Sequence, residues 1–273
     1  MKKELIGVVH LPPLPGSPRG SLKNLEEAEE RVGREAKILS REGFTGIILE
    51  NYGDKPYPKT SSSPLTVASM TRLVLKAREI FPGKVGVNIL RNCGVEALSV
   101  AEVTGADFVR VNVLGGAKVT DQGIIEGVGR EMAYLKGAVK VLADVDVKHS
   151  CPLGNGYDPL AEALDLVERG GADGLIITGR RTGDEADETL LRTLKENLPG
   201  TPVFVGSGVT PGNMKRFCEA DGFIVGTYLR LGRGDWKRER WTGGERKRSW
   251  KLSENCCRKK RDFHRWVYIS PRF

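Results

Sequence analysis

Short apolar runs alternate with longer amphipathic stretches along the chain, with a repeat of about 30 residues. Eight of the runs are rich in Val and Ile, which is typical of parallel strands buried on both faces. Eight strands alternating with helical stretches predict an α/β fold, a (β/α)8 TIM barrel, because an open doubly wound sheet usually has fewer strands. The predicted strands are Leu5–Leu11, Gly46–Asn51, Lys84–Leu90, Phe108–Val113, Lys140–Val147, Gly174–Thr178, Pro202–Val205 and Gly222–Val225.

The amphipathic stretches have apolar residues at the spacing of one helix face. Gly105 follows one stretch as a C-terminal stop, and Asp158 precedes Pro159 as an N-cap and first-turn proline. The segment Asn112–Gly123 is expected to be a βα loop, either plain or serving as a lid over the strand ends. The predicted helices are Leu25–Leu39, Val67–Ile80, Val95–Val103, Ile124–Leu135, Leu160–Val167 and Thr189–Leu198.

Polar side chains stand at the predicted C-terminal ends of the strands, where (β/α)8 barrels have their active sites. One such residue often serves the core alone, but charges are costly to bury without a partner or a function. Because at least five strands place ionisable or amide groups at the same end, we predict a ligand pocket there. The substrate-binding candidates are Glu50, Asn88, Arg110 and Asn112, and the catalytic candidates are His10, Asp144, Asp146, Lys148 and His149.

The residue types leave several roles open for the catalytic candidates. Asp144 or Asp146 can act as a general base or can neutralise a neighbouring cation. His10 and His149 are able to carry protons near neutral pH. Lys148 can bind a phosphate or carboxylate, or can form a Schiff base if it is desolvated.

Two glycine motifs close the last two predicted strands. Gly206-Ser207-Gly208 follows the seventh strand, and Gly226-Thr227 follows the eighth. The loops at these two places form the usual phosphate site of a (β/α)8 barrel. Glycine lets backbone N–H groups approach a phosphate, because no Cβ stands in the way. We therefore predict that these five residues bind phosphate.

The composition changes abruptly near residue 229, so we divide the chain into a barrel domain, 1–229, and a tail, 230–273. The tail has 15 Lys and Arg against five acidic residues, all four Trp and no Ala. The whole chain has a formal charge of +8, so the barrel part is close to −2. A basic tail with aromatic residues could bind nucleic acid or be a solvated extension. We favour translation in a shifted reading frame, which would explain the missing final helix and remove any functional meaning from the basic charge.

Other signals exclude several classes of protein. Cys93, Cys151 and Cys218 are scattered, and Cys256-Cys257 fall in the tail, so no metal-binding pattern appears. The chain has no secretion signal and no apolar run of membrane-spanning length, which favours a cytoplasmic protein. No GxxxxGK[ST] loop and no GxGxxG fingerprint after the first strand is present, which argues against a P-loop nucleotidase and a Rossmann dehydrogenase.

Several blocks in order resemble the BtpA/SgcQ family, over about Leu5 to Arg230. They are Ile6–Leu11 with Leu14–Pro18, Glu50–Asp54, Gly86–Asn92, Arg110–Val113, Thr120–Gly123, Ala143–His149 and Val205–Thr210. The resemblance implies a TIM barrel of the ribulose-phosphate-binding type. It also implies a link to photosystem I biogenesis in cyanobacteria, and to bacterial sugar metabolism through the second namesake. The family supplies no catalytic residue, and its members continue after Leu229 with a final amphipathic helix that this sequence lacks.

The pocket and the glycine motifs together predict an enzyme that acts on a small phosphorylated metabolite, such as a sugar or nucleoside phosphate. The alternative that the resemblance implies is a non-catalytic assembly factor for a membrane complex. No cofactor is predicted, although a divalent metal held by Glu50, Asp144 and His149 is a further alternative. We expect no nucleic-acid partner and leave homo-oligomer formation open.

Overall fold

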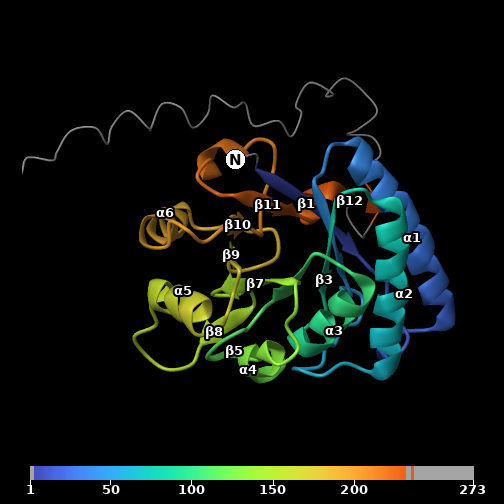
Figure 1. The fold of residues 1–273 in the computed structure, drawn as a ribbon, viewed down its shortest axis with the longest axis horizontal. Coiled ribbons are helices and arrows are strands. Elements are labelled where there is room, and N and C mark those ends of the chain that lie inside the picture. The colour runs from blue at the N-terminus through green and yellow to red at the C-terminus, as the bar shows by residue number, and fades with distance from the viewer. Residues whose placement is uncertain (1–2, 232–234, 237–273) are drawn as a thin grey trace, which may run out of the picture.

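Eight parallel strands close into a barrel in the computed structural model, which describes residues 3–231 and 235–236 (Figure 1). Around the barrel the strand order is β1-β11-β10-β9-β7-β4-β3-β2. The predicted (β/α)8 barrel is confirmed, and each predicted strand coincides with an observed one apart from residues at its ends. The barrel strands are β1 Glu4–His10, β2 Gly46–Glu50, β3 Lys84–Asn88, β4 Phe108–Val111, β7 Lys140–Val145, β9 Gly174–Ile177, β10 Val203–Val205 and β11 Gly222–Val225.

Apolar side chains from alternate strand positions fill the inside of the barrel. Two aromatic rings, Phe108 and Phe204, lie in this inner cluster with six aliphatic side chains. Gly86 lies beside Phe108 in register and Gly222 beside Phe204. A Cβ at Gly86 would stand 2.2 Å from the Phe108 ring, and one at Gly222 would stand 2.6 Å from the Phe204 ring. The absence of a side chain at Gly86 and Gly222 therefore makes room for the two rings, which block the end of the barrel opposite the pocket.

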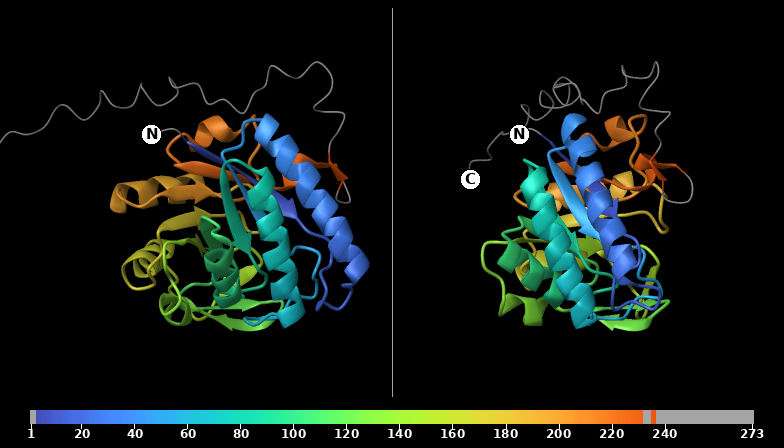
Figure 2. Two further views of the ribbon diagram at one scale, coloured as in Figure 1. Left: turned by 45° about the vertical axis from the view of Figure 1, so that its right-hand side comes forward. Right: turned by 90° about the vertical axis from the view of Figure 1, so that its right-hand side faces the viewer.

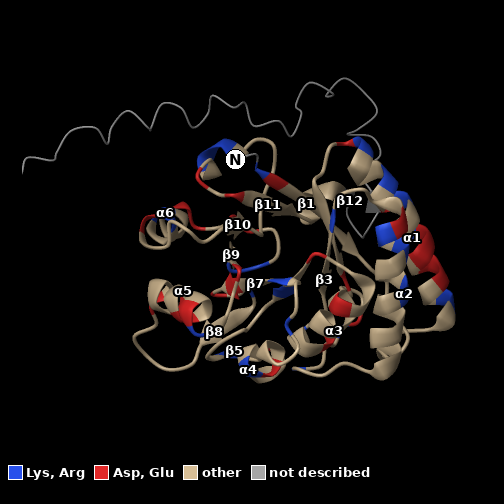
Figure 3. Ribbon diagram, viewed as in Figure 1, with Lys and Arg blue, Asp and Glu red and all other residues tan. Residues whose placement is uncertain are grey.

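Helices cover the outside of the barrel, and α1 and α2 run side by side over its N-terminal strands (Figure 2). Ser21, Ser63, Asp158 and Asp187 cap four of the helices by accepting hydrogen bonds from backbone N–H groups. The outward surface of α1 carries many charged residues (Figure 3). The helices are α1 Leu22–Arg41, α2 Pro64–Ile80, α3 Gly94–Thr104, α4 Gly129–Ala133, α5 Pro159–Glu168 and α6 Glu188–Asn197.

The predicted helix Ile124–Leu135 is wrong over its first part. Gly123–Glu126 forms strand β6, and only the short α4 follows. Ile125 is fully buried against Val113 and Val147, whereas its neighbour Ile124 is exposed. Alternate burial is the pattern of a strand, and so short an apolar run cannot separate strand from helix by its sequence period.

The segment Asn112–Gly123, expected to be a loop or lid, contains a strand of a small sheet outside the barrel. In that antiparallel sheet β5, Ala117–Thr120, lies between β6 and β8, Ser150–Pro152. The sheet ties the loop after β4 to the loop after β7, because β5 belongs to the first and β8 to the second. The β4–β5 and β7–β8 segments therefore hold one another above the strand ends.

The last two barrel strands are followed by short elements. A 3-10 helix, η1 Met214–Phe217, follows β10, and a second, η2 Thr227–Leu229, follows β11. Two short antiparallel strands come next, β12 Arg230–Leu231 and β13 Asp235–Trp236. Within the described residues no α-helix follows β11. Most of the predicted tail, including the proposed frame shift, lies outside the described residues.

Candidate active site

The inside of the barrel opens into a pocket of about 170 Å³ at the C-terminal ends of the strands. Apolar side chains of Val8 and Ile224, which also belong to the inner cluster of the barrel, form its deep end. Polar groups from the loops after the strands line the rest. The polar or charged side chains that line it are His10, Glu50, Tyr52, Lys55, Tyr57, Asn88, Arg91, Arg110, Asn112, Lys148, His149, Thr182, Ser207, Thr210, Thr227 and Tyr228.

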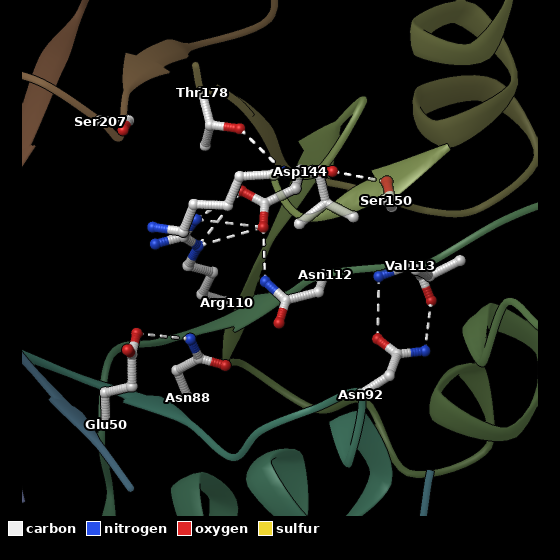
Figure 4. A network of polar contacts seen from close by, with 12 residues as sticks. Glu50, Asn88, Asn92, Arg110, Asn112, Val113, Asp144, Ser150, Thr178 and Ser207 are labelled. Atoms are coloured by element: carbon white, nitrogen blue, oxygen red, sulfur yellow. Dashed lines mark hydrogen bonds and ion pairs between the residues drawn. The ribbon is translucent and has the colours of Figure 1, made fainter. Parts of the chain in front are cut away.

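A buried ion pair occupies one side of the pocket (Figure 4). The Arg110 guanidinium donates from Nε and Nη2 to the Asp144 carboxylate at 3.1 Å, and Asn112 Nδ2 donates to the same carboxylate at 2.5 Å. All three side chains are almost fully buried. Burial alone would lower the pKa of Arg110, but the nearby Asp144 and Glu50 carboxylates raise it overall. Arg110 therefore presents a permanent positive charge to the pocket.

A second polar group, on β1, β2 and β3, contains His10. Its Nε2 lies 3.6 Å from Glu50 Oε1, and Asn88 Nδ2 donates to Glu50 Oε2 at 2.9 Å. The ring of His10 stacks on Tyr52 with 4.4 Å between centroids, and the Lys55 ammonium lies 3.6 Å from the centre of the Tyr52 ring. These contacts fix both the carboxylate and the imidazole.

The charges around Glu50 decide its protonation. Burial acts to raise the pKa of Glu50, but His10, Lys148 and Arg110 outweigh it, so the pKa lies below its usual value. Glu50 is therefore ionised near neutral pH.

Lys148 and His149 reach the pocket from the segment after β7. The Lys148 N–H donates to Thr178 Oγ1 at 3.2 Å, and Arg91 Nη2 donates to the Lys148 carbonyl oxygen at 2.5 Å. Burial and the neighbouring Arg110 lower the pKa of Lys148 to about 8. His149 Nε2 lies 2.9 Å from Thr182 Oγ1, and burial together with Arg91 and Lys148 lowers the pKa of His149.

The two glycine motifs meet at the same pocket, as predicted. A Cβ on Gly208, which has φ +65°, would approach the Asp184 carbonyl oxygen to 2.6 Å. At Gly226 a Cβ would stand 3.4 Å from the His10 ring. Within the part of the chain that the structure describes, the N–H groups of Ser207 and Gly208 have no hydrogen-bond acceptor. The neighbouring protein backbone therefore requires glycine at position 208, and backbone N–H groups without an acceptor are a property of anion sites.

The structure brings most predicted site residues together. His10, Glu50, Asn88, Arg110, Asn112, Lys148, His149, Gly206, Ser207, Gly208, Gly226 and Thr227 all line the pocket. Asp144 lies directly behind Arg110 and does not line it. The prediction placed Asp146 beside Asp144, but its side chain is exposed, 3.6 Å from Lys118 Nζ and outside the pocket lining. Asp146 has φ +48°, so the strand alternation that puts residues 144 and 146 on one face has already ended.

Five cationic or aromatic residues of the described lining were not among the predicted site residues: Tyr52, Lys55, Tyr57, Arg91 and Tyr228. Each lies in the segment after a barrel strand, so strand-end reasoning extended into the loops would have included them. The hypothetical metal ligands Glu50, Asp144 and His149 are not brought into one cluster. Among the described residues no group of three or more His, Cys, Asp or Glu side chains is arranged to hold a metal ion.

The fold is a (β/α)8 TIM barrel with a polar pocket at the C-terminal ends of its strands. The chain belongs to the BtpA family, whose model matches residues 1–238. It is 48% identical over 235 residues to the uncharacterized protein PH1209 of Pyrococcus horikoshii, covering 84% of this chain and 88% of the relative. It is 42% identical over 231 residues to the Photosystem I biogenesis protein BtpA of Synechocystis, covering 83% and 80%.

A solved structure supports the fold independently of the family. Phosphoribosyl anthranilate isomerase from Thermus thermophilus superposes with a TM-score of 0.51 at 11% identity, covering 86% of this chain and 93% of the isomerase. At that identity the likeness concerns the fold alone. A separate observation bears on the membrane: no helix in the described ranges combines the length and the apolarity that crossing a bilayer needs.

Proposed function

We propose that the protein is an enzyme acting on a small phosphorylated metabolite, such as a sugar or nucleoside phosphate. The observation that carries this proposal is the charge of the pocket. Four cationic side chains line it, from Lys55, Arg91, Arg110 and Lys148, whereas Glu50 is the only carboxylate among the described lining residues. Even with Asp144 behind Arg110, positive charge is in excess, so an anionic ligand is favoured.

The glycine motifs give that anion a specific place. Ser207 and Gly208 follow β10 and line the pocket, and Gly226-Thr227 follows the adjacent strand β11 and lines it too. Backbone N–H groups bind a phosphate without the entropy cost of ordering long side chains. In this proposal the phosphate lies at Gly206, Ser207, Gly208, Gly226 and Thr227, and the polar remainder of the ligand meets Asn88, Arg110 and Asn112.

His10 is the group we propose for proton transfer. It lies between the Glu50 carboxylate and the Gly226 end of the phosphate motifs. Glu50 orients the imidazole, and Asn88 in turn holds Glu50. A histidine with an ionised carboxylate at its side can both take up and release a proton at neutral pH.

Ligand binding tests the proposal directly. The melting temperature of the protein is measured with inorganic phosphate and with a panel of sugar and nucleoside phosphates, each paired with its unphosphorylated form. We expect an increase of several degrees for some phosphorylated members alone, because a ligand at 100 times its Kd adds about 2.7 kcal/mol. No shift with any phosphorylated compound would refute the proposal.

A pair of glycine variants locates the binding. Gly226→Val places a side chain in the phosphate site, whereas Gly212→Val changes a glycine of the same region that does not line the pocket. We expect the first variant to lose the ligand-induced shift and the second to keep it.

The Synechocystis relative favours a second candidate function, because it is named as a photosystem I biogenesis protein. In that case the chain would be an assembly or stability factor for a membrane complex. Affinity capture from solubilised membranes of the source cells separates the candidates. Recovery of the subunits of one complex by both the wild type and Gly226→Val would favour the assembly role over catalysis.

A further inference from the structure

The segment after β7 holds Lys148 in an unusual backbone setting. Asp146 has φ +48° and His149 has φ +60°, so two residues without glycine's freedom adopt left-handed conformations around this lysine. Such conformations cost free energy and persist only where the surroundings enforce them. Contacts on both sides of the Lys148 backbone, from Thr178 and Arg91, supply that enforcement. The backbone contacts therefore hold Lys148 in a fixed position, which a lysine that served only as a surface charge would not need.

The surroundings of the Lys148 ammonium disfavour its charge. Its side chain is half-buried in the pocket, with Arg110 and Arg91 nearby and the Glu50 and Asp144 carboxylates partly offsetting them. With a pKa of about 8, about a quarter of Lys148 is neutral at pH 7.5, against about a thousandth for an ordinary lysine. A lysine beside other cations is the arrangement that frees an amine for nucleophilic attack.

We propose that Lys148 is a nucleophile that forms a Schiff base with the carbonyl carbon of a phosphorylated aldehyde or ketone. This inference rests on the proposed function, because the glycine motifs hold the phosphate while the carbonyl meets the amine in the same pocket. The neutral Nζ attacks the carbonyl carbon, a C–N bond forms, and the carbonyl oxygen takes up a proton to become a hydroxyl. The nitrogen then loses a proton, the hydroxyl leaves as water after a second protonation, and a protonated imine remains.

Two histidines are placed to move these protons. His10 and His149 line the same pocket, and His149 is the next residue along the chain from Lys148. His10 has the Glu50 carboxylate 3.6 Å from its Nε2, whereas the lowered pKa of His149 favours its neutral, basic form. One imidazole thus donates to the leaving hydroxyl, and the other accepts from the nitrogen.

Reductive trapping tests the proposal on the full-length protein. The protein is incubated with D-glyceraldehyde 3-phosphate and sodium cyanoborohydride, which reduces an imine to a stable secondary amine, and the modified lysines are located by mass spectrometry. We expect Lys148 to react at least about tenfold faster than the other lysines, in proportion to its larger neutral fraction. Its rate should rise with pH and reach half its maximum near pH 8.

Three controls accompany this measurement. Lys55, which also lines the pocket but lies over the Tyr52 ring, serves as the internal reference. Lys148→Arg keeps the positive charge but cannot form the adduct, so labelling at this position should vanish while inorganic phosphate still raises the melting temperature. Unphosphorylated D-glyceraldehyde should label Lys148 much more slowly, and added inorganic phosphate should protect it.

The outcomes separate this inference from the function on which it rests. If phosphate compounds raise the melting temperature but Lys148 is labelled no faster than Lys55, the Schiff base is refuted and Lys148 is a phosphate-binding cation. If glyceraldehyde labels Lys148 as fast as its phosphate does, the role of the glycine motifs in this step is refuted. If neither binding nor labelling occurs, both proposals fail.

Discussion

Asp144 and Asp146 show how residues of one short motif come to serve different purposes. The sequence predicted both at the strand end, and the alternation of a strand put them on one face. Asp144 lies within β7 and pairs with Arg110 in the interior, whereas Asp146 lies beyond it, turned outward toward Lys118. The alternation was right as far as the strand continued. The end of β7 and the positive φ of Asp146 depend on tertiary contacts, which no local sequence pattern contains.

Removing Asp144 should be far more harmful than changing Asp146. Asp144→Ala leaves the buried Arg110 charge without its partner, which costs about 3–5 kcal/mol of unfolding free energy. Asp146→Asn, which tolerates the positive φ and changes an exposed side chain, should cost less than about 1 kcal/mol. Urea titrations of the two variants measure both values, and a similar small loss for each would contradict the proposed role of the buried pair.

Glu50 should make stability depend on pH. Its pKa is lowered in the folded state, so its ionised form adds stability that is present above about pH 4.5 and is lost as the pH falls through the folded-state pKa. Glu50→Gln removes this contribution. We therefore expect the difference in unfolding free energy between wild type and Glu50→Gln to shrink from pH 6 to pH 3, measured by urea titration at each pH, with the exposed Glu168→Gln as baseline. A difference that stayed constant over this range would contradict the charge network around Glu50.

At the scale of elements, the eight strands were readable because buried parallel strands are continuous apolar runs. The small sheet of β5, β6 and β8 was not, because its strands have only three or four residues and one of its two pairings joins β5 to the distant β8. The residues of the pocket also divide into those that the sequence predicted and those that it did not. Its strand-end residues were predicted, whereas Arg91 and Lys55 come from loops whose path depends on the assembled barrel.

The packing of Gly86 on β3 against Phe108 on β4 predicts how substitutions at these two positions combine. Gly86→Ala on β3 should cost about 1–3 kcal/mol, because the added methyl meets the Phe108 ring of β4. Phe108→Leu in the same chain should recover part of that loss, so the double variant should cost less than the two single changes added together. Gly200→Ala, where a Cβ meets nothing within 4 Å, is the matched control. Strict additivity, measured by urea titration, would contradict the packing described.

At the scale of the whole molecule, the ring of helices is incomplete along the described chain. An α-helix follows each barrel strand except β10 and β11 before the next barrel strand begins. After β4 this helix is the short α4, which comes after β5 and β6. The composition beyond residue 229 fits no further amphipathic helix. The family model nevertheless matches through residue 238, so the barrel itself follows the family pattern.

Replacing residues 230–273 with the corresponding segment of the Pyrococcus horikoshii relative should therefore stabilise the barrel. We expect the melting temperature to rise by about 2–4 °C for each 1 kcal/mol that the packed segment adds to the unfolding free energy. The phosphate-induced shift should also increase, since the segment follows Gly226-Thr227 directly. Equal melting temperatures and equal shifts for the two proteins would show that the segment from the relative contributes nothing to either property.

The Phe108 and Phe204 rings inside the barrel also affect the order in which the parts of a ligand enter and leave the pocket. Because these rings block one end of the barrel, ligands enter and leave at the C-terminal ends of the strands. The part of a ligand that rests against Val8 and Ile224 must then enter first and leave last. A phosphate already seated on the glycine turns would stand across this route. Free phosphate, which in our proposal occupies the place of the ligand's own phosphate, should then slow the entry of the next ligand, so that ligand uptake depends on the phosphate concentration without any second site.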